Sequence, residues 1–116
     1  MGFTDTTLNT AVTAVTALGT WISAHTGDPS TTGANEVAGG SYARKQTTWG
    51  AAANGDQTGS QVSITIPGGN TVTHWGLWTA VSGGTFRGGF ELDSSEGFGA
   101  AGVLNLTMTI DADNAP

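Results

Sequence analysis

The sequence has no cysteine, only three basic residues and no long apolar run. The lack of cysteine excludes disulfides, thiolate metal sites and thiol nucleophiles, and it leaves the redox compartment open. Three basic residues against nine acidic ones give a net charge of −6, too few cations to neutralise a run of phosphates. We therefore expect neither nucleic-acid binding nor binding to an anionic membrane. No apolar run approaches the ~18 residues of a membrane-spanning helix, and the N-terminus does not have the pattern of a secretory signal.

Charged residues of both signs are also scarce. They make up 10% of the chain, against about 25% in ordinary soluble domains. The chain is nevertheless not typical of disorder, because it contains four Trp, four Phe and one Tyr. Threonine, which favours strands, and glycine, which favours turns, are abundant. We expect a single β-rich domain over residues 1–116.

A helix is predicted near the N-terminus, over about residues 5–19. Thr4 or Asp5 can cap its start, and Gly19 can end it. Its other face carries threonine rather than charged residues, so the helix requires packing against a core or a neighbouring subunit. The apolar residues that recur in steps of three and four, and so share one face, are Leu8, Val12, Val15, Leu18 and Ile22.

Strands are predicted within residues 21–110. The segment 71–79 carries tryptophan on both faces, which indicates a central strand covered on both sides. Gly88 and Gly89 inside another segment indicate a bulge or a close approach of a neighbour. The pattern favours a mainly β fold: an antiparallel β-sandwich or small barrel of about six strands with one N-terminal α-helix. The six expected strands lie within residues 21–25, 41–49, 61–66, 71–79, 85–92 and 103–110.

The two histidines are the first candidates for chemistry. His25 and Asp28 have the spacing of a pair that can hold a cation, but the more ordinary interpretation is structural. In that interpretation Asp28 caps the turn before Pro29 and His25 fills the end of a strand. His74 lies in an apolar strand, where a histidine is more often part of a core than a catalytic base.

The acidic residues form two weaker candidates. Segment 111–114 faintly resembles a calcium loop but lacks the glycine and glutamate that the motif requires. Glu91, Asp93 and Glu96 could serve glycoside hydrolysis, although such a cluster is more often simply solvated. We therefore expect no catalytic, cofactor or metal site, and a protein that is not an enzyme.

Six motifs in fixed order resemble a small virion structural protein family of tailed bacteriophages, especially phages of actinobacteria. The motifs are HTGDP (25–29), TGANEV (32–37), GGSYAR (39–44), VTHWGLW (72–78), SGGTF (82–86) and EGFG (96–99). The resemblance covers most of residues 3–110. Members are usually labelled tail-fibre or minor tail proteins, and similar small chains are capsid accessory proteins. Members often have an apolar or aromatic residue at the positions of Lys45 and Trp75.

The resemblance implies a non-enzymatic virion component made in the host cytoplasm. Chain length favours a capsid decoration or cementing protein on the particle surface, because 116 residues can cap a lattice position but cannot form both shaft and tip of a fibre. The alternative is a tail-fibre or minor tail protein, an adhesin module that binds host cell-surface glycan through exposed tryptophan. The expected partners are copies of the chain itself, possibly as a trimer, and the major capsid protein or tail proteins.

Intersubunit contacts are expected in the loop 26–44. Within it, Arg44 and Glu36 are two of the few charged residues and could pair across an interface. Tryptophan can serve a core, a subunit interface or a carbohydrate platform, in that order of preference here. The candidate interface residues are Asp28, Glu36, Tyr42, Arg44, Trp75 and Trp78.

Overall fold

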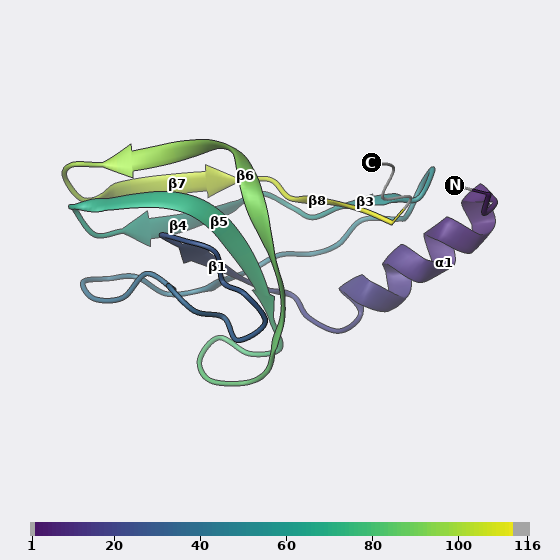
Figure 1. Ribbon diagram of the computed structural model, residues 1–116, viewed down its shortest axis with the longest axis horizontal. Coiled ribbons are helices and arrows are strands. Elements are labelled where there is room, and N and C mark those ends of the chain that lie inside the picture. Colours follow the sequence, from purple (N-terminus) through teal and green to yellow (C-terminus); the bar gives the residue numbers. More distant parts are fainter. Residues whose placement is uncertain (1, 113–116) are drawn as a thin grey trace.

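The computed structural model describes residues 2–112, which contain one N-terminal helix and eight strands paired antiparallel (Figure 1). This confirms the predicted mainly β fold. The elements are α1 (Asp5–Thr16), β1 (Trp21–His25), β2 (Lys45–Gln46), β3 (Asp56–Thr58), β4 (Val62–Ile66), β5 (Asn70–Trp78), β6 (Phe86–Phe98), β7 (Gly102–Leu106) and β8 (Thr109–Asp111). α1 is too short to cross a membrane, and no other helix occurs among these residues.

The strands form one four-stranded sheet and two ribbons. The sheet has the order β2-β1-β5-β6, and the ribbons pair β4 with β7 and β3 with β8. A single buried cluster contains Ile22 and Leu77 of the sheet together with Ile64 and Leu104 of the β4–β7 ribbon. The ribbon therefore packs on one face of the sheet, and the arrangement is a small sandwich rather than a closed barrel.

The opposite face of the sheet is covered by the loop 26–44. A Cβ on Gly33 would collide with the Trp78 ring, and a Cβ on Gly89 would collide with the ring of Pro29. The close approach predicted at the glycine pair is thus confirmed. The prediction that β5 is central and covered on both sides is also confirmed, because the loop covers one side and the ribbon the other.

The structure corrects several strand boundaries. Of the strand expected over residues 41–49, only β2 forms a strand, and Trp49 adds an isolated antiparallel bridge to Gly59. Before β2, Tyr42 and Arg44 turn toward Glu36 instead. The strand expected over 103–110 is divided into β7 and β8, which pair with different partners. β3 was missed because its three residues carry no apolar side chain. β6 continues to Phe98, past two register shifts.

The helix also differs from its prediction. Thr4 caps its start, as expected, but the helix ends at Thr16 rather than near Gly19. Leu8 and Val12 are buried, whereas Val15 and Leu18 are 41% and 49% exposed. Packing against a neighbouring subunit, the other expectation for the helix, stays a prediction, while these last two residues lie outside the chain's own core. The physical reason is that α1 lies beside β3 at one end of the molecule (Figure 1), and a ribbon covers only part of a helix face.

Candidate functional site

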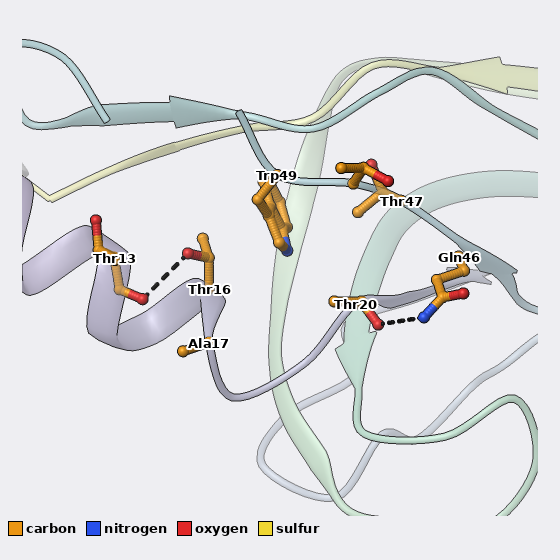
Figure 2. A pocket seen from close by; sticks show the side chains of 8 residues that line it. Thr13, Thr16, Ala17, Thr20, Gln46, Thr47 and Trp49 are labelled. Atoms are coloured by element: carbon orange, nitrogen blue, oxygen red, sulfur yellow. Dashed lines mark hydrogen bonds between the residues drawn. The ribbon is translucent and has the colours of Figure 1, made fainter. Parts of the chain in front are cut away.

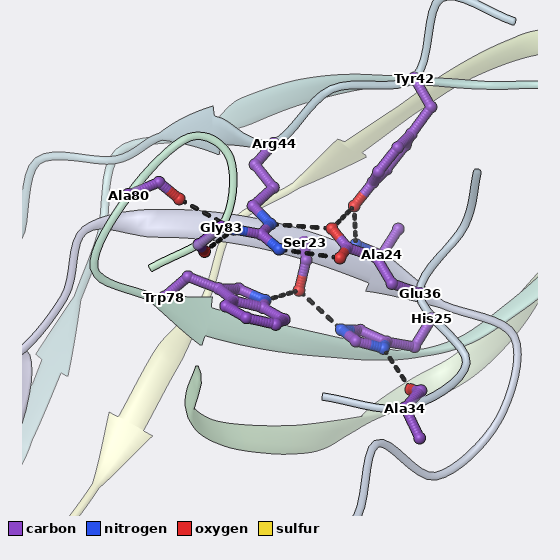
Figure 3. A network of polar contacts seen from close by, with 10 residues as sticks. All are labelled: Ser23, Ala24, His25, Ala34, Glu36, Tyr42, Arg44, Trp78, Ala80 and Gly83. Atoms are coloured by element: carbon purple, nitrogen blue, oxygen red, sulfur yellow. Dashed lines mark hydrogen bonds and ion pairs between the residues drawn. The ribbon is translucent and has the colours of Figure 1, made fainter. Parts of the chain in front are cut away.

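An extensive polar arrangement is centred on Arg44, at the end of the loop 26–44 (Figure 3). The guanidinium forms a two-pronged ion pair with Glu36, in which Nε and Nη2 donate to the two carboxylate oxygens at 2.9 Å each. Nη1 donates to the carbonyl oxygens of Ala80 at 3.0 Å and Gly83 at 2.9 Å. The guanidinium carbon also lies 3.5 Å from the ring centroid of Trp78. Arg44 thus ties the loop to the connection after β5.

Tyr42 completes the surroundings of the Glu36 carboxylate. Its hydroxyl donates to Glu36 Oε2 at 2.7 Å and accepts the backbone N–H of Ala24 at 3.1 Å. Burial by itself raises the pKa of Glu36, but hydrogen bonds from Arg44 and Tyr42 outweigh it and hold that pKa below its ordinary value. Burial, with the bond to Glu36, raises the pKa of Tyr42. The carboxylate is therefore ionised and neutralises the buried guanidinium.

A second chain of hydrogen bonds runs from Trp78 to the loop. The indole N–H donates to Ser23 Oγ at 2.9 Å, Ser23 Oγ lies 2.6 Å from His25 Nε2, and His25 Nδ1 lies 2.8 Å from the carbonyl oxygen of Ala34. A carbonyl only accepts, so Nδ1 carries the proton and the Ser23 hydroxyl donates to Nε2. Burial lowers the pKa of His25 and favours this neutral form. Both ring nitrogens are engaged, which leaves neither available as a base or ligand.

The structural interpretation of His25 and Asp28 is confirmed. His25 is buried at the end of β1, as just described, and Asp28 Oδ1 accepts the backbone N–H of Ser30 at 2.8 Å to cap the turn. Asn35 Nδ2 donates to the carbonyl of Asp28 at 3.0 Å, and Thr26 N–H donates to the carbonyl of Asn35 at 2.9 Å. The motifs of loop 26–44 therefore serve first to hold this loop in place.

The predicted interface residues fall into two groups. Arg44 and Glu36 were expected to pair between subunits, but they pair within one chain, because the loop folds back over its own sheet. Trp75 and Trp78 are only 5% and 9% exposed, so the expectation of an exposed tryptophan platform is wrong for both. Tyr42 is half-buried, and Asp28 is exposed. Contact of these residues with another subunit stays a prediction. Ser23 is not among the predicted site residues, because no sequence pattern separates it from other strand serines.

The described residues form several surface hollows, and two of them have a tryptophan in their lining. The first, of about 410 Å³, lies between α1 and β2, with the Trp49 indole as one wall (Figure 2). Its other lining residues are Thr13, Thr16, Ala17, Thr20, Gln46, Thr47 and Thr48. The second, of about 420 Å³, lies along β6 and includes Glu91 and Asp93. Threonine hydroxyls can bind a polar molecule, but the first hollow has no titratable side chain among its lining residues.

Metal binding finds no support in residues 2–112, where no group of three or more histidine and acidic side chains could hold an ion. The faint calcium-loop pattern at 111–114 lies partly outside the described residues, which end at residue 112. Glu91, Asp93 and Glu96 are exposed along β6, as expected of solvated carboxylates.

We expect the free energy of unfolding to fall in two steps as the pH is lowered. Burial holds the pKa of His25 below its ordinary 6.5, so the unfolded chain binds this proton first and stability declines once the pH passes below about 6.5. The lowered pKa of Glu36 gives a second decline below about 4.5. Urea unfolding across a pH series would measure a slope of up to about 1.4 kcal/mol per pH unit for each proton.

The matched variant for this pH series is His25→Gln, which keeps a neutral polar side chain in the buried position. It should abolish the decline that begins near pH 6.5 and retain the decline at lower pH. A variant profile that runs parallel to that of the unaltered chain over the whole range would show that His25 does not cause the first step.

Comparison with known proteins gives one family match. A family model described as podophage GP4 fiber I protein gp80 matches residues 3–110. No curated protein matches the chain significantly. The matched range includes the whole polar arrangement around Arg44, as well as all strands except the end of β8.

Proposed function

The chain belongs to the family of the podophage GP4 fiber I protein gp80, and we propose that it is a non-enzymatic structural subunit of a phage tail fibre. The family match over residues 3–110 carries this proposal. The family is one of phage fibre proteins, so the resemblance to virion structural proteins of tailed phages is confirmed at that level. The matched family is one of fibre proteins, which favours the tail-fibre alternative over the capsid decoration that chain length suggested.

The internal bonding of the chain supports a structural role. No buried side-chain nitrogen or oxygen of residues 2–112 lacks a hydrogen-bond partner, and the chain's most polar cluster is used to fasten a loop. A fully satisfied polar network favours one rigid arrangement. A rigid subunit is what a protein that transmits force or position along a virion requires. The partners in this proposal are tail proteins and further copies of the chain.

Host-glycan binding is left out of the proposal. The adhesin interpretation depended on exposed Trp75 and Trp78, and both are buried. Of the other two tryptophans, Trp49 forms one wall of the threonine-lined hollow but also donates its indole N–H to the carbonyl of Gly19 at 3.0 Å. That bond gives Trp49 a structural role of its own.

Immunogold electron microscopy of intact phage particles with an antibody to this chain would test the location. We expect label on the fibres at the tail. The same antibody, absorbed beforehand with the purified chain, serves as the control and should leave the particles unlabelled. Label distributed over the head would overturn the proposal and restore the capsid-decoration hypothesis.

A further inference from the structure

Strand β6 leaves one edge of the four-stranded sheet open. In the sheet order β2-β1-β5-β6 it lies at the end, so only β5 pairs with it among the described residues. With 13 residues it is also much longer than β2, the two-residue strand at the opposite edge. Such an edge presents a row of unpaired backbone N–H and C=O groups, which favours pairing with a further strand.

The stretch from Gly88 to Glu91 is the regular and accessible part of this edge. It pairs residue for residue with β5, and the two register shifts lie on either side of it. Gly89 is exposed, although the Pro29 ring lies against one of its faces. Since Gly89 has no side chain, this exposure belongs to its backbone, so the loop 26–44 leaves the edge open there. Proline and lysine, which commonly block such edges, do not occur in β6.

The residues around Gly89 are complementary to themselves in an antiparallel pair. Side chains alternate between the two faces of a strand, so two copies keep like faces together only if a residue lies on the two-fold axis between them. With Gly89 on this axis, Arg87 of each copy lies opposite Glu91 of the other. Gly88 then lies opposite Phe90. Opposite charges across a strand pair are favourable, and a glycine leaves room for an aromatic ring beside it.

These pairs identify the occupant of the edge as a second copy of the chain. Arg87 and Glu91 are both exposed, and neither has an ion-pair partner within residues 2–112. The chain has only three basic residues and a net charge of −6, so most ways of opposing two copies would bring carboxylates together. An axis at Glu91, for example, would oppose two of them directly. The axis at Gly89 instead forms the attractive pair twice.

We propose that two copies of this chain join edge to edge by antiparallel pairing of β6, with Gly89 on the two-fold axis. The two four-stranded sheets then form one continuous sheet. Such a contact uses the same surface of both copies and closes on itself, so it produces a dimer. The inference goes beyond the proposed function and does not depend on where in the virion the protein is located.

Charge reversal tests the pairing, with the mass of the purified full chain measured by sedimentation velocity over a range of concentrations. We expect a dimer for the unaltered chain. In Arg87→Glu, dimerisation should weaken about tenfold or more, because two symmetry-related attractions become repulsions. Adding Glu91→Arg to this variant reverses both charges and should restore the dimer.

Lys45→Glu is the matched control, because it makes the same change of charge on an exposed residue at the opposite edge of the sheet. It should dimerise like the unaltered chain. Circular dichroism should show unchanged folding in all these variants, since the substituted residues are exposed. A double reversal that fails to restore the dimer would overturn the proposal. A monomeric unaltered chain would also overturn it and would leave the edge to a strand of another protein.

Disulfide crosslinking tests the register itself, because the chain has no cysteine of its own. Directly opposed residues of a strand pair are close enough for a disulfide, so Arg87→Cys mixed with Glu91→Cys should form linked dimers under mild oxidation. Each variant alone should not, because its two cysteines would lie four residues apart along the strands, about 13 Å. A mixture that crosslinks no better than either variant alone would contradict this register.

Discussion

Replacing Arg44 with methionine is expected to lower the free energy of unfolding by about 3–5 kcal/mol, the cost of leaving one partner of a buried ion pair without the other. The substitution removes both contacts to Glu36 and leaves a largely buried carboxylate without its cation. It also leaves the carbonyls of Ala80 and Gly83 without their donor. Chemical denaturation of the purified chain would measure the loss.

Two further variants separate the charge from the geometry. In Arg44→Met combined with Glu36→Gln, no unpaired buried charge remains, so the double variant should be more stable than Arg44→Met alone. Arg44→Lys keeps the charge but cannot form the two-pronged pair, and it should be intermediate. If Arg44→Met changed assembly while leaving the stability of the isolated chain intact, the pair would act between subunits after all.

The second large effect is expected at Trp75. Its replacement by alanine should lower the free energy of unfolding by about 3–5 kcal/mol, because it empties a large volume in the buried cluster. It also removes the stacked contact with Phe90, whose ring centroid lies 4.4 Å away. Thermal and urea unfolding would both measure the change.

Val81→Ala is the matched control, because it removes an apolar side chain that is already exposed. Its effect should stay within about 0.5 kcal/mol. The comparison also bears on function. A Trp75→Ala chain that is fully stable but has lost binding to host cells would reinstate the adhesin hypothesis in its original form.

The sequence allowed the charged pair of the candidate site to be predicted, but not the other contacts of Arg44. The chain has only three basic residues, and this small number was enough to suggest that Arg44 pairs with Glu36. That the pair closes within one chain could not, because it depends on the loop folding back until residues far apart in sequence meet. The bonds from Arg44 to the carbonyls of Ala80 and Gly83 span more than 30 residues and have no sequence pattern. The role of Ser23 likewise depends on the side chains that face it in the folded chain, which are those of Trp78 and His25.

The sequence by itself determined the elements whose pattern is local. In β4, apolar residues at alternate positions Val62, Ile64 and Ile66 are all buried, as a strand with one covered face requires. The same period-two pattern located β1 and β5, and the three-to-four period located α1. Such patterns are fixed by backbone geometry, which every residue shares.

The tertiary structure decided which element packs against each face of the helix and of the strands. Val15 and Leu18 belong to the same apolar stripe as Leu8, yet they are exposed because the β3–β8 ribbon beside α1 is too narrow to cover them. Segment 41–49 alternates little and is shaped by Tyr42 and Arg44 turning toward β1 and β5. An apolar stripe on a helix indicates that burying this face is favourable, because burial removes its apolar side chains from water. Only the arrangement of the whole chain determines what provides that burial.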